Sequence, residues 1–253
     1  MPQPHLAMIE ALRSIRVWLS SGLLIASWSI SVWLVSLFDR HPLRLRTARC
    51  FRRLGEALAA VNPWKIHFSG RENIRPGQTY VVVCNHQSLA DIPLVAHLRI
   101  DAKWLAKAEL FRIPIVGWMM SLARDIPVER GDRRKAAQAL LQAARVLRQG
   151  CSLVFFPEGT RSTDGAVLPF NEGPFQLALR EGIPVLPVVL DGSGAALPRA
   201  TWRFSGSYDI HLRVLPESPS EGRDPKDTAG FRDEVRQRIV EGLAEIRTQA
   251  PAP

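Results

Sequence analysis

Cysteine, tyrosine and acidic residues are all scarce in this sequence. Its 253 residues include three cysteines, two tyrosines and 24 Asp and Glu residues, against 33 Lys and Arg residues. The cysteines are odd in number and lie far apart, which argues against a disulfide framework or a cysteine metal site and favours a reducing compartment. The lack of aromatic residues among the basic ones argues against nucleic acid as a partner. A formal net charge of +9 instead favours anionic lipid headgroups or phosphorylated substrates.

Charge is absent from residues 17–38, which read VWLSSGLLIASWSISVWLVSLF. As a helix, this run is long enough to cross the roughly 30 Å hydrocarbon core of a bilayer, and its tryptophans suit the membrane interface. Its serines make it only moderately hydrophobic, so a tilted or half-inserted helix is an alternative, as is a buried core helix. A cleaved signal peptide fits poorly because the run is long. The sequence therefore predicts a membrane anchor.

A second helix is expected directly after this run. Apolar residues recur there at helical spacing, at Phe51, Leu54, Leu58 and Val61. Six arginines accompany them: Arg40, Arg44, Arg46, Arg49, Arg52 and Arg53. Such a helix suits either an anionic leaflet or the surface of a globular domain, and the neighbouring anchor favours the leaflet. The arginine excess predicts that this side faces the cytoplasm, which places the protein on the inner (cytoplasmic) membrane.

The rest of the chain alternates between strand and helix patterns. Short β-rich runs occur at 64–68, 79–84, 151–156, 184–190 and 208–215, and helical patterns at 131–150 and 228–247. This alternation predicts an α/β fold with a central mixed sheet covered by helices. We therefore expect N-terminal membrane-anchoring helices over residues 1–61 and an α/β domain over residues 62–253.

The stretch NHQSLAD, residues 85–91, follows the apolar run TYVVVC. A strand ending there places His86 at the carboxyl edge of the sheet, where open α/β folds bind ligands. Pro93 suits the first turn of a helix, so a helix begins near Ser88 or Asp91. Asp91 is then either a helix cap or a carboxylate that accepts the Nδ1 proton of His86 and makes Nε2 more basic. The spacing alone does not separate these interpretations, and one aspartate can do both.

A second apolar strand ends in polar residues at VFFPEGTRS, residues 154–162. Gly159 permits a close backbone approach, Thr160 offers a hydroxyl, and Arg161 is a fork-shaped donor suited to phosphate. The alternative is a surface turn in which Glu158 and Arg161 are simply solvated. Two strand ends with convergent polar residues favour a site.

A third polar element is LARDIPVERGD, residues 122–132. Its Arg130 either supplies a second guanidinium for the same anion or is a solvated turn arginine. In this order, the elements resemble the glycerolipid acyltransferase family, which includes bacterial 1-acylglycerol-3-phosphate acyltransferases. NHQSLAD matches its His-x4-Asp motif, FPEGTRS its Pro-Glu-Gly motif, IPVERGD its arginine motif and IPVLPVVLDGS its fourth motif. The resemblance extends over residues 62–215.

The resemblance implies a membrane-bound acyltransferase that makes phosphatidate from 1-acyl-sn-glycerol-3-phosphate. His86 would be the general base on the free hydroxyl of the lysophospholipid, and Asp91 would orient it. The acyl donor would be acyl-CoA or acyl carrier protein, used as a co-substrate, with no metal and no further cofactor. The remaining site residues implied are Arg130 and Arg161 for the acceptor's phosphate, Gly159 and Thr160 for the shape of that pocket, Glu158 in a structural or acceptor-positioning role, and Lys107 as a further candidate near the site.

One stretch departs from the family pattern. Many members carry a lysine in a Phe-Lys-x-Gly sequence after the Pro-Glu-Gly motif, whereas this chain reads FNEGPF at 170–175. Asn171 and Glu172 remove positive charge where a phosphate-bearing acceptor would pass, so a lysolipid such as lyso-ornithine lipid is an alternative acceptor. A non-catalytic lipid-binding membrane protein and a hydrolase using His86 are further alternatives; the intact motifs argue against the first, and the lack of a second acid or metal cluster against the second.

Overall fold

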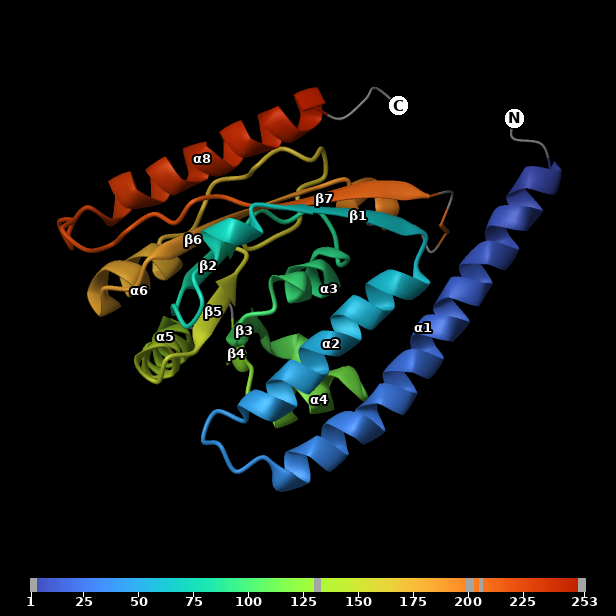
Figure 1. Ribbon diagram of the computed structural model, residues 1–253, viewed down its shortest axis with the longest axis horizontal. Helices are drawn as coiled ribbons and strands as arrows, with labels where there is room; N and C mark the ends of the chain where they lie inside the picture. Colours follow the sequence, from blue (N-terminus) through green and yellow to red (C-terminus); the bar gives the residue numbers. More distant parts are fainter. Residues whose placement is uncertain (1–3, 130–132, 199–202, 205–206, 250–253) are drawn as a thin grey trace.

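The computed structural model describes residues 4–129, 133–198, 203–204 and 207–249. It begins with two long helices, α1 (Pro4–Phe38) and α2 (Leu45–Val61), which run side by side in opposite directions (Figure 1). The chain then forms, in order, β1 (Trp64–Ser69), η1 (Arg71–Asn73), β2 (Val81–Cys84), α3 (Asp91–Val95), η2 (Ala96–Leu98), β3 (Ala102–Lys107), η3 (Ala108–Arg112), α4 (Val116–Leu122), β4 (Ile126–Val128), α5 (Arg133–Arg148), β5 (Ser152–Phe155), α6 (Gly173–Glu181), β6 (Val185–Asp191), α7 (Ser193–Ala196), β7 (Tyr208–Val214) and α8 (Thr228–Gln249).

The seven strands of the described residues form one sheet in the order β1-β7-β6-β2-β5-β3-β4. Strands β6, β2, β5, β3 and β4 run parallel to one another, whereas β7 is antiparallel to β6 and parallel to the edge strand β1. This confirms the predicted mixed sheet. The five parallel strands end at one edge, here called the carboxyl edge, where ligand crevices form in open α/β folds.

Helices cover both faces of the sheet (Figure 1). Helices α5, α6 and α8 pack on one face, against side chains that include Val83, Phe155 and Val189. The other face packs on α3 through Val82 and Val154. Successive strand residues point to opposite faces, so strands covered on both sides appear in the sequence as continuous apolar runs. That is why β2, β5 and β6 were predictable from the sequence.

Helix α2 lies between α1 and α3. A Cβ on Gly55 would stand only 3.0 Å from Ala96 Cβ and 3.0 Å from Pro93 Cα, so glycine is needed for this close approach. On another face of α2, Leu54 packs with Val32 of α1 and Met119 of α4. The apolar stripe predicted for α2 therefore exists, but the expectation that it faces lipid is corrected: α1 and α4 cover much of it.

The arginines of this region are divided between internal contacts and the surface. Arg49 forms a bidentate ion pair with Asp101 at 2.6 Å, and Arg52 is bound to the buried carboxylate of Asp125. Arg44 donates to the carbonyl oxygens of Ser36 and Asp39 at the end of α1. The remaining three, Arg40, Arg46 and Arg53, are exposed.

Strands β3 and β4 were not predicted from the sequence. Strand β3 contains Lys103, whose side chain is fully buried and whose Nζ donates to Ala123 O at 2.6 Å. Burial lowers the pKa of Lys103 to about 8, partly opposed by the nearby Asp125 carboxylate. Strand β4 has three residues and includes Pro127. A charged residue inside one strand and a proline inside the other remove the pattern by which strands are recognised.

Candidate functional site

The NHQSLAD turn joins β2 to α3 at the carboxyl edge. His86 Nδ1 lies 2.7 Å from Asp91 Oδ2, and the Asp91 side chain is fully buried. The same oxygen accepts hydrogen bonds from the backbone N–H groups of Gln87 at 2.7 Å and Ser88 at 2.8 Å. The helix-cap interpretation of Asp91 is wrong, because Asp91 is the first residue of α3 and Ala90 is the N-cap. Its carboxylate instead holds the turn that precedes the helix and the imidazole at the same time. With Nδ1 engaged, Nε2 is the nitrogen left to exchange a proton with a bound substrate.

Neighbours of His86 tie the turn to strand β6, and sequence reasoning missed them. The Asn85 amide donates to Leu190 O and accepts from Leu190 N, both at 2.8 Å. Gln87 Nε2 donates to Leu190 O at 3.2 Å and to Asp191 Oδ1 at 3.1 Å. The polar residues on both sides of His86 were the available signal, because a buried Asn or Gln needs specific partners.

The Pro-Glu-Gly turn packs directly against this turn. Glu158 Oε1 accepts a hydrogen bond from His86 N at 2.9 Å, and Ser162 N donates to His86 O at 2.8 Å. The Phe156 ring stacks on the imidazole, with centroids 4.3 Å apart. Two motifs about 70 residues apart in sequence therefore form one structural unit, and His86 is held by its ring and by both of its backbone polar groups. Phe156 is a further contact that sequence reasoning missed.

Glu158 is only 8% exposed, which excludes the alternative in which it is solvated. Burial raises the pKa of its carboxyl to about 7, although the hydrogen bond from His86 N opposes this shift. Since this carboxyl is engaged by the backbone of the histidine turn, the geometry favours the structural role over direct contact with an acceptor.

The other expected site residues are placed as follows. Gly159 adopts φ +71°, in the left-handed region that glycine tolerates, which turns the chain sharply after β5. Thr160 is exposed and Arg161 half-buried, and no described acidic side chain forms an ion pair with Arg161. Lys107 ends β3 at the carboxyl edge, where its Nζ is 3.4 Å from Glu109 Oε1. Arg130 lies outside the described residues.

The residues that replace the family lysine are part of the scaffold. Asn171 Nδ2 donates to Pro157 O at 2.6 Å, and Asn171 N donates to the same oxygen at 2.9 Å. The Glu172 carboxylate pairs with Arg232 of α8 at 3.0 Å. Asn171 therefore holds the Pro-Glu-Gly turn through the carbonyl oxygen of Pro157, and the charge of Glu172 is partly neutralised by Arg232.

An apolar pocket of about 240 Å³ begins beside the NHQSLAD turn and is called the apolar pocket below. Leu89 of that turn, Ala106 near the end of β3 and Leu110 of η3 line its side toward the carboxyl edge. Trp104, Arg52 and Asp125 line its side away from that edge. The pocket therefore leads from the neighbourhood of His86 along β3, beneath α2, and its size and lining suit a hydrocarbon chain.

Comparisons with known proteins agree with this geometry. A family model described as Acyltransferase matches residues 65–191. The chain is 32% identical over 250 residues to the chloroplastic 1-acyl-sn-glycerol-3-phosphate acyltransferase BAT2 of Brassica napus, covering 96% of this chain and 70% of that protein. It is 33% identical over 186 residues to the human 1-acyl-sn-glycerol-3-phosphate acyltransferase alpha, covering 73% of this chain and 65% of that protein. The crystal structure of the 1-acyl-sn-glycerophosphate acyltransferase PlsC from Thermotoga maritima superimposes with a TM-score of 0.83 at 26% identity, covering 98% of this chain and 100% of that one.

Proposed function

The chain belongs to the acyltransferase family, and from that membership we propose that it transfers a fatty acyl group to the free hydroxyl of 1-acyl-sn-glycerol-3-phosphate to give phosphatidate. The observation that carries this proposal is the His86–Asp91 pair, held at the carboxyl edge by the Pro-Glu-Gly turn. Two relatives, whose alignments cover 96% and 73% of the chain, are named for this reaction, as is the structural neighbour.

The geometry supports a direct transfer. Asp91 holds the Nδ1 proton of His86, so Nε2 takes the proton of the acceptor's hydroxyl as its oxygen attacks the thioester carbonyl. When the tetrahedral intermediate collapses, the C–S bond breaks and the thiolate receives that proton from the imidazolium. The buried carboxylate stabilises the imidazolium between these steps. The acceptor itself is the nucleophile, so no acyl-enzyme forms and the thioester is the only co-substrate.

Arg161 is the proposed ligand of the acceptor's phosphate. It follows the turn that contacts His86, and no described carboxylate pairs with it. Guanidinium groups bind phosphate in a bidentate manner, which would fix the glycerol backbone relative to His86. Thr160 and Gly159 would shape this subsite, together with Arg130 from the neighbouring motif. Lys107 is a weaker candidate because Glu109 is within ion-pair distance of it.

Asn171 and Glu172 support a second candidate acceptor. These residues make scaffold contacts where many relatives carry a lysine, so the site has one fewer positive charge to offer a phosphate. A lysolipid without glycerol phosphate, such as lyso-ornithine lipid, therefore belongs in any test of the acceptor.

Helix α1 is a candidate membrane segment. Within Met8–Phe38, an 18-residue stretch has a mean hydropathy of 1.7, and only 11% of that stretch is buried. We place it within one leaflet. Ser14 Oγ accepts from Phe204 N at 2.8 Å, and Trp28 Nε1 donates to Cys50 O at 2.9 Å, so α1 follows the α/β domain along much of its length. If α1 spanned the bilayer, Phe204 and Cys50, whose backbone groups are bonded to it, would lie in the hydrocarbon core. Its opposite face exposes large apolar side chains: Leu12, Leu19, Leu23, Ile30, Leu34 and Leu37.

This placement is tested by labelling Arg13→Cys in intact cells with a membrane-impermeant maleimide. Arg13 is exposed near the start of the apolar stretch. If α1 lies in the cytoplasmic leaflet, labelling requires permeabilised cells. Labelling of intact cells would show that the helix spans the membrane and would overturn the proposed placement.

The proposed reaction is tested with the purified full-length chain in lipid vesicles. The acceptors are 1-acyl-sn-glycerol-3-phosphate, lyso-ornithine lipid and a neutral lysolipid, each with acyl-CoA or acyl carrier protein as donor. We expect phosphatidate to form, and His86→Ala to abolish its formation while folding and membrane partitioning are retained. The matched control is His67→Ala, because His67 forms a similar 2.7 Å pair with Asp209 on β7 but lies in the edge strand β1 and is exposed.

Each outcome has a distinct meaning. If lyso-ornithine lipid is acylated in preference to 1-acyl-sn-glycerol-3-phosphate, it becomes the proposed acceptor. If no lysolipid is acylated, the lipid-binding alternative is favoured. Turnover by His86→Ala equal to that of His67→Ala would remove the general-base role of His86.

A further inference from the structure

The two sides of the NHQSLAD turn differ in chemistry. The apolar pocket lies on the β3 side of the turn, where Leu89 lines it. On the other side, β6 is the next strand in the sheet, and its last residue is Asp191. Gln87 is only 7% exposed, and its side-chain Nε2 donates to Asp191 Oδ1 at 3.1 Å. The turn that carries His86 is therefore held on this side by a polar contact with the end of β6.

Asp191 is bound in turn by Arg247, which lies near the end of α8. Arg247 Nη2 donates to Asp191 Oδ1 at 2.9 Å, and Arg247 Nε donates to Asp191 Oδ2 at 3.2 Å, so the pair is bidentate. The same Nη2 donates to Gly165 O at 2.9 Å. Gly165 has φ +76°, and a Cβ there would lie 2.9 Å from Nη2, so glycine is needed for this approach. Neither the four motifs nor the family model, which ends at residue 191, includes α8.

The first route from Arg247 leads to the imidazole of His86. Through Asp191, the guanidinium fixes the side chain of Gln87. The backbone N–H of Gln87 binds Asp91 Oδ2, the same oxygen that holds the ring of His86. A displacement of Gln87 therefore disturbs the contact that orients the imidazole.

The second route leads from Gly165 to the backbone of His86. The segment that contains Gly165 forms a compact turn around Asp164, whose Oδ1 accepts from Ser162 Oγ at 2.9 Å and from Ala166 N at 3.0 Å. Ser162 N in turn donates to His86 O at 2.8 Å. One guanidinium is thus connected both to the ring and to the backbone of His86.

We propose that Arg247 is a positioning residue, which fixes His86 relative to the acceptor's phosphate site by tying both routes to one point of α8. The inference rests on the proposed acyl transfer, in which Arg161 binds the phosphate and His86 takes the hydroxyl proton. Arg161 directly precedes Ser162, so a shift of the segment that contains Gly165 moves the bound acceptor relative to Nε2 of His86. A misplacement of about 1 Å between reacting groups costs up to about 100-fold in rate.

The chemistry of arginine suits this role. Its planar fork presents several N–H groups in fixed directions, so Arg247 serves both oxygens of the Asp191 carboxylate and the carbonyl oxygen of Gly165 at once. The Arg247 side chain is 45% exposed, so this ion pair is open to solvent on one side and contributes little to stability. Replacement of Arg247 should therefore leave the fold intact and change the position of the reacting groups.

The test compares Arg247→Ala with wild type in the vesicle assay, with 1-acyl-sn-glycerol-3-phosphate as acceptor. We expect kcat to fall by about tenfold or more, whereas the KM for the thioester changes by less than about twofold. Arg247→Lys should recover only part of kcat, because an ammonium group lacks the planar fork that serves a carboxylate and a carbonyl together. Millimolar guanidinium chloride should raise the kcat of Arg247→Ala, and sodium chloride at the same concentration should not.

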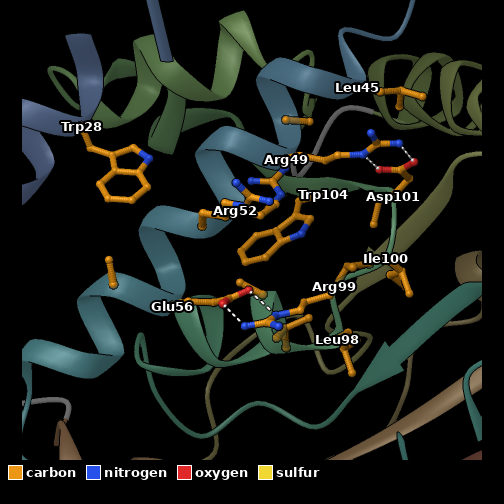
Figure 2. Close-up of a pocket in the computed structure, with 17 residues that line it drawn as sticks. Trp28, Leu45, Arg49, Arg52, Glu56, Leu98, Arg99, Ile100, Asp101 and Trp104 are labelled. Carbon is orange, nitrogen blue, oxygen red and sulfur yellow. Dashed lines mark hydrogen bonds and ion pairs between the residues drawn. The ribbon is translucent and has the colours of Figure 1, made fainter. Parts of the chain in front are cut away.

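Two other arginines serve as matched controls. Arg49 also forms a bidentate pair that joins a helix to a strand end, but its partner Asp101 precedes β3, at the opposite edge of the sheet (Figure 2). Arg238 lies in α8 like Arg247, but it donates to Pro216 O at 2.6 Å, close to the start of β6 instead of its end. Arg49→Ala and Arg238→Ala should keep kcat within about twofold of wild type.

A double variant separates positioning from general destabilisation. Because Gln87 lies on one of the two routes, Arg247→Ala should lower kcat less in a Gln87→Ala background than in wild type. Additive losses would overturn the proposal, as would a kcat of Arg247→Ala within about twofold of that of Arg49→Ala. If Arg247→Ala does not fold, Arg247→Lys takes its place under the same criterion. A wild-type enzyme that transfers no acyl group would instead contradict the proposed function.

Discussion

Asp91 is expected to have two separable roles, and two substitutions distinguish them. A single oxygen, Oδ2, accepts hydrogen bonds from the His86 ring and from the backbone N–H groups of Gln87 and Ser88. In Asp91→Asn, the amide oxygen is expected to occupy the position of Oδ2, because the amide nitrogen cannot accept hydrogen bonds from the two backbone N–H groups. The turn and the imidazole orientation are then retained, and what is lost is the negative charge that stabilises the imidazolium. In Asp91→Ala, both backbone groups lose their acceptor as well.

The magnitudes follow from these contacts. Leaving a buried N–H without a partner costs about 1–3 kcal/mol, so Asp91→Ala should lower the free energy of unfolding by about 2–6 kcal/mol. Asp91→Asn should lower it by less than Asp91→Ala. Its kcat should nevertheless fall by about 10²- to 10⁴-fold, the range that general-base assistance contributes. Activity and stability should therefore be uncoupled in Asp91→Asn and lost together in Asp91→Ala.

The assay pairs initial acyl-transfer rates with denaturant unfolding in the same detergent. Asp39 offers a matched control, because it is a buried carboxylate whose Oδ2 caps Thr47 N at 2.8 Å and Thr47 Oγ1 at 2.9 Å, with no histidine ring bound. Asp39→Asn should cost stability comparable to Asp91→Asn and leave kcat close to wild type. The reasoning is refuted if Asp91→Asn retains kcat within about twofold of the Asp39→Asn control.

Two further predictions concern the Pro-Glu-Gly turn. Arg161→Ala should raise the KM for a phosphate-bearing acceptor more than it lowers kcat. The control is Arg148→Ala, which removes an exposed arginine of α5 paired with Glu181 and should change neither KM nor kcat. Equal kinetics for the two variants would exclude phosphate binding by Arg161. Burial raises the pKa of Glu158 to about 7 in the fold from 4.5 unfolded, so the folded state holds a proton that the unfolded chain releases, and stability falls as pH rises between those values. Glu158→Gln keeps an acceptor for His86 N without this loss, and it should gain up to about 3 kcal/mol over wild type between pH 5 and pH 8; thermal melts that show a pH-independent difference would contradict this.

The strand ends show how far pattern reasoning reaches. Strands β2, β5 and β6 are buried on both faces, so each is visible as an apolar run whose end can be located. The polar residues that follow β2 and β5 were therefore recognisable as two strand ends, and the structure brings them to one edge because β2 and β5 are parallel neighbours. Strand β3 was not predictable, because Lys103 interrupts its apolar pattern. The partner that this buried lysine binds, the carbonyl oxygen of Ala123, is 20 positions away in the sequence.

The region of α1 and α2 shows the same limit. Its helices and its apolar stretch were predictable from periodicity and length, because both are local properties. Which arginines stay exposed was not: Arg52 turns inward to Asp125, a residue more than 70 positions away, whereas Arg53 beside it is exposed. Helical periodicity says which residues share a face, but not which element covers that face.

By itself, the sequence determined the elements with strong local patterns, the order of the motifs and the chemical types of residue available at the carboxyl edge. Only the tertiary structure decided that Asp91 holds both the turn and the His86 ring, that Glu158 supports the histidine backbone, and that Arg52 turns inward to Asp125. The physical reason is that periodicity and capping act over a few residues, whereas burial, hydrogen-bond partners and cavities are set by packing between segments far apart in the chain.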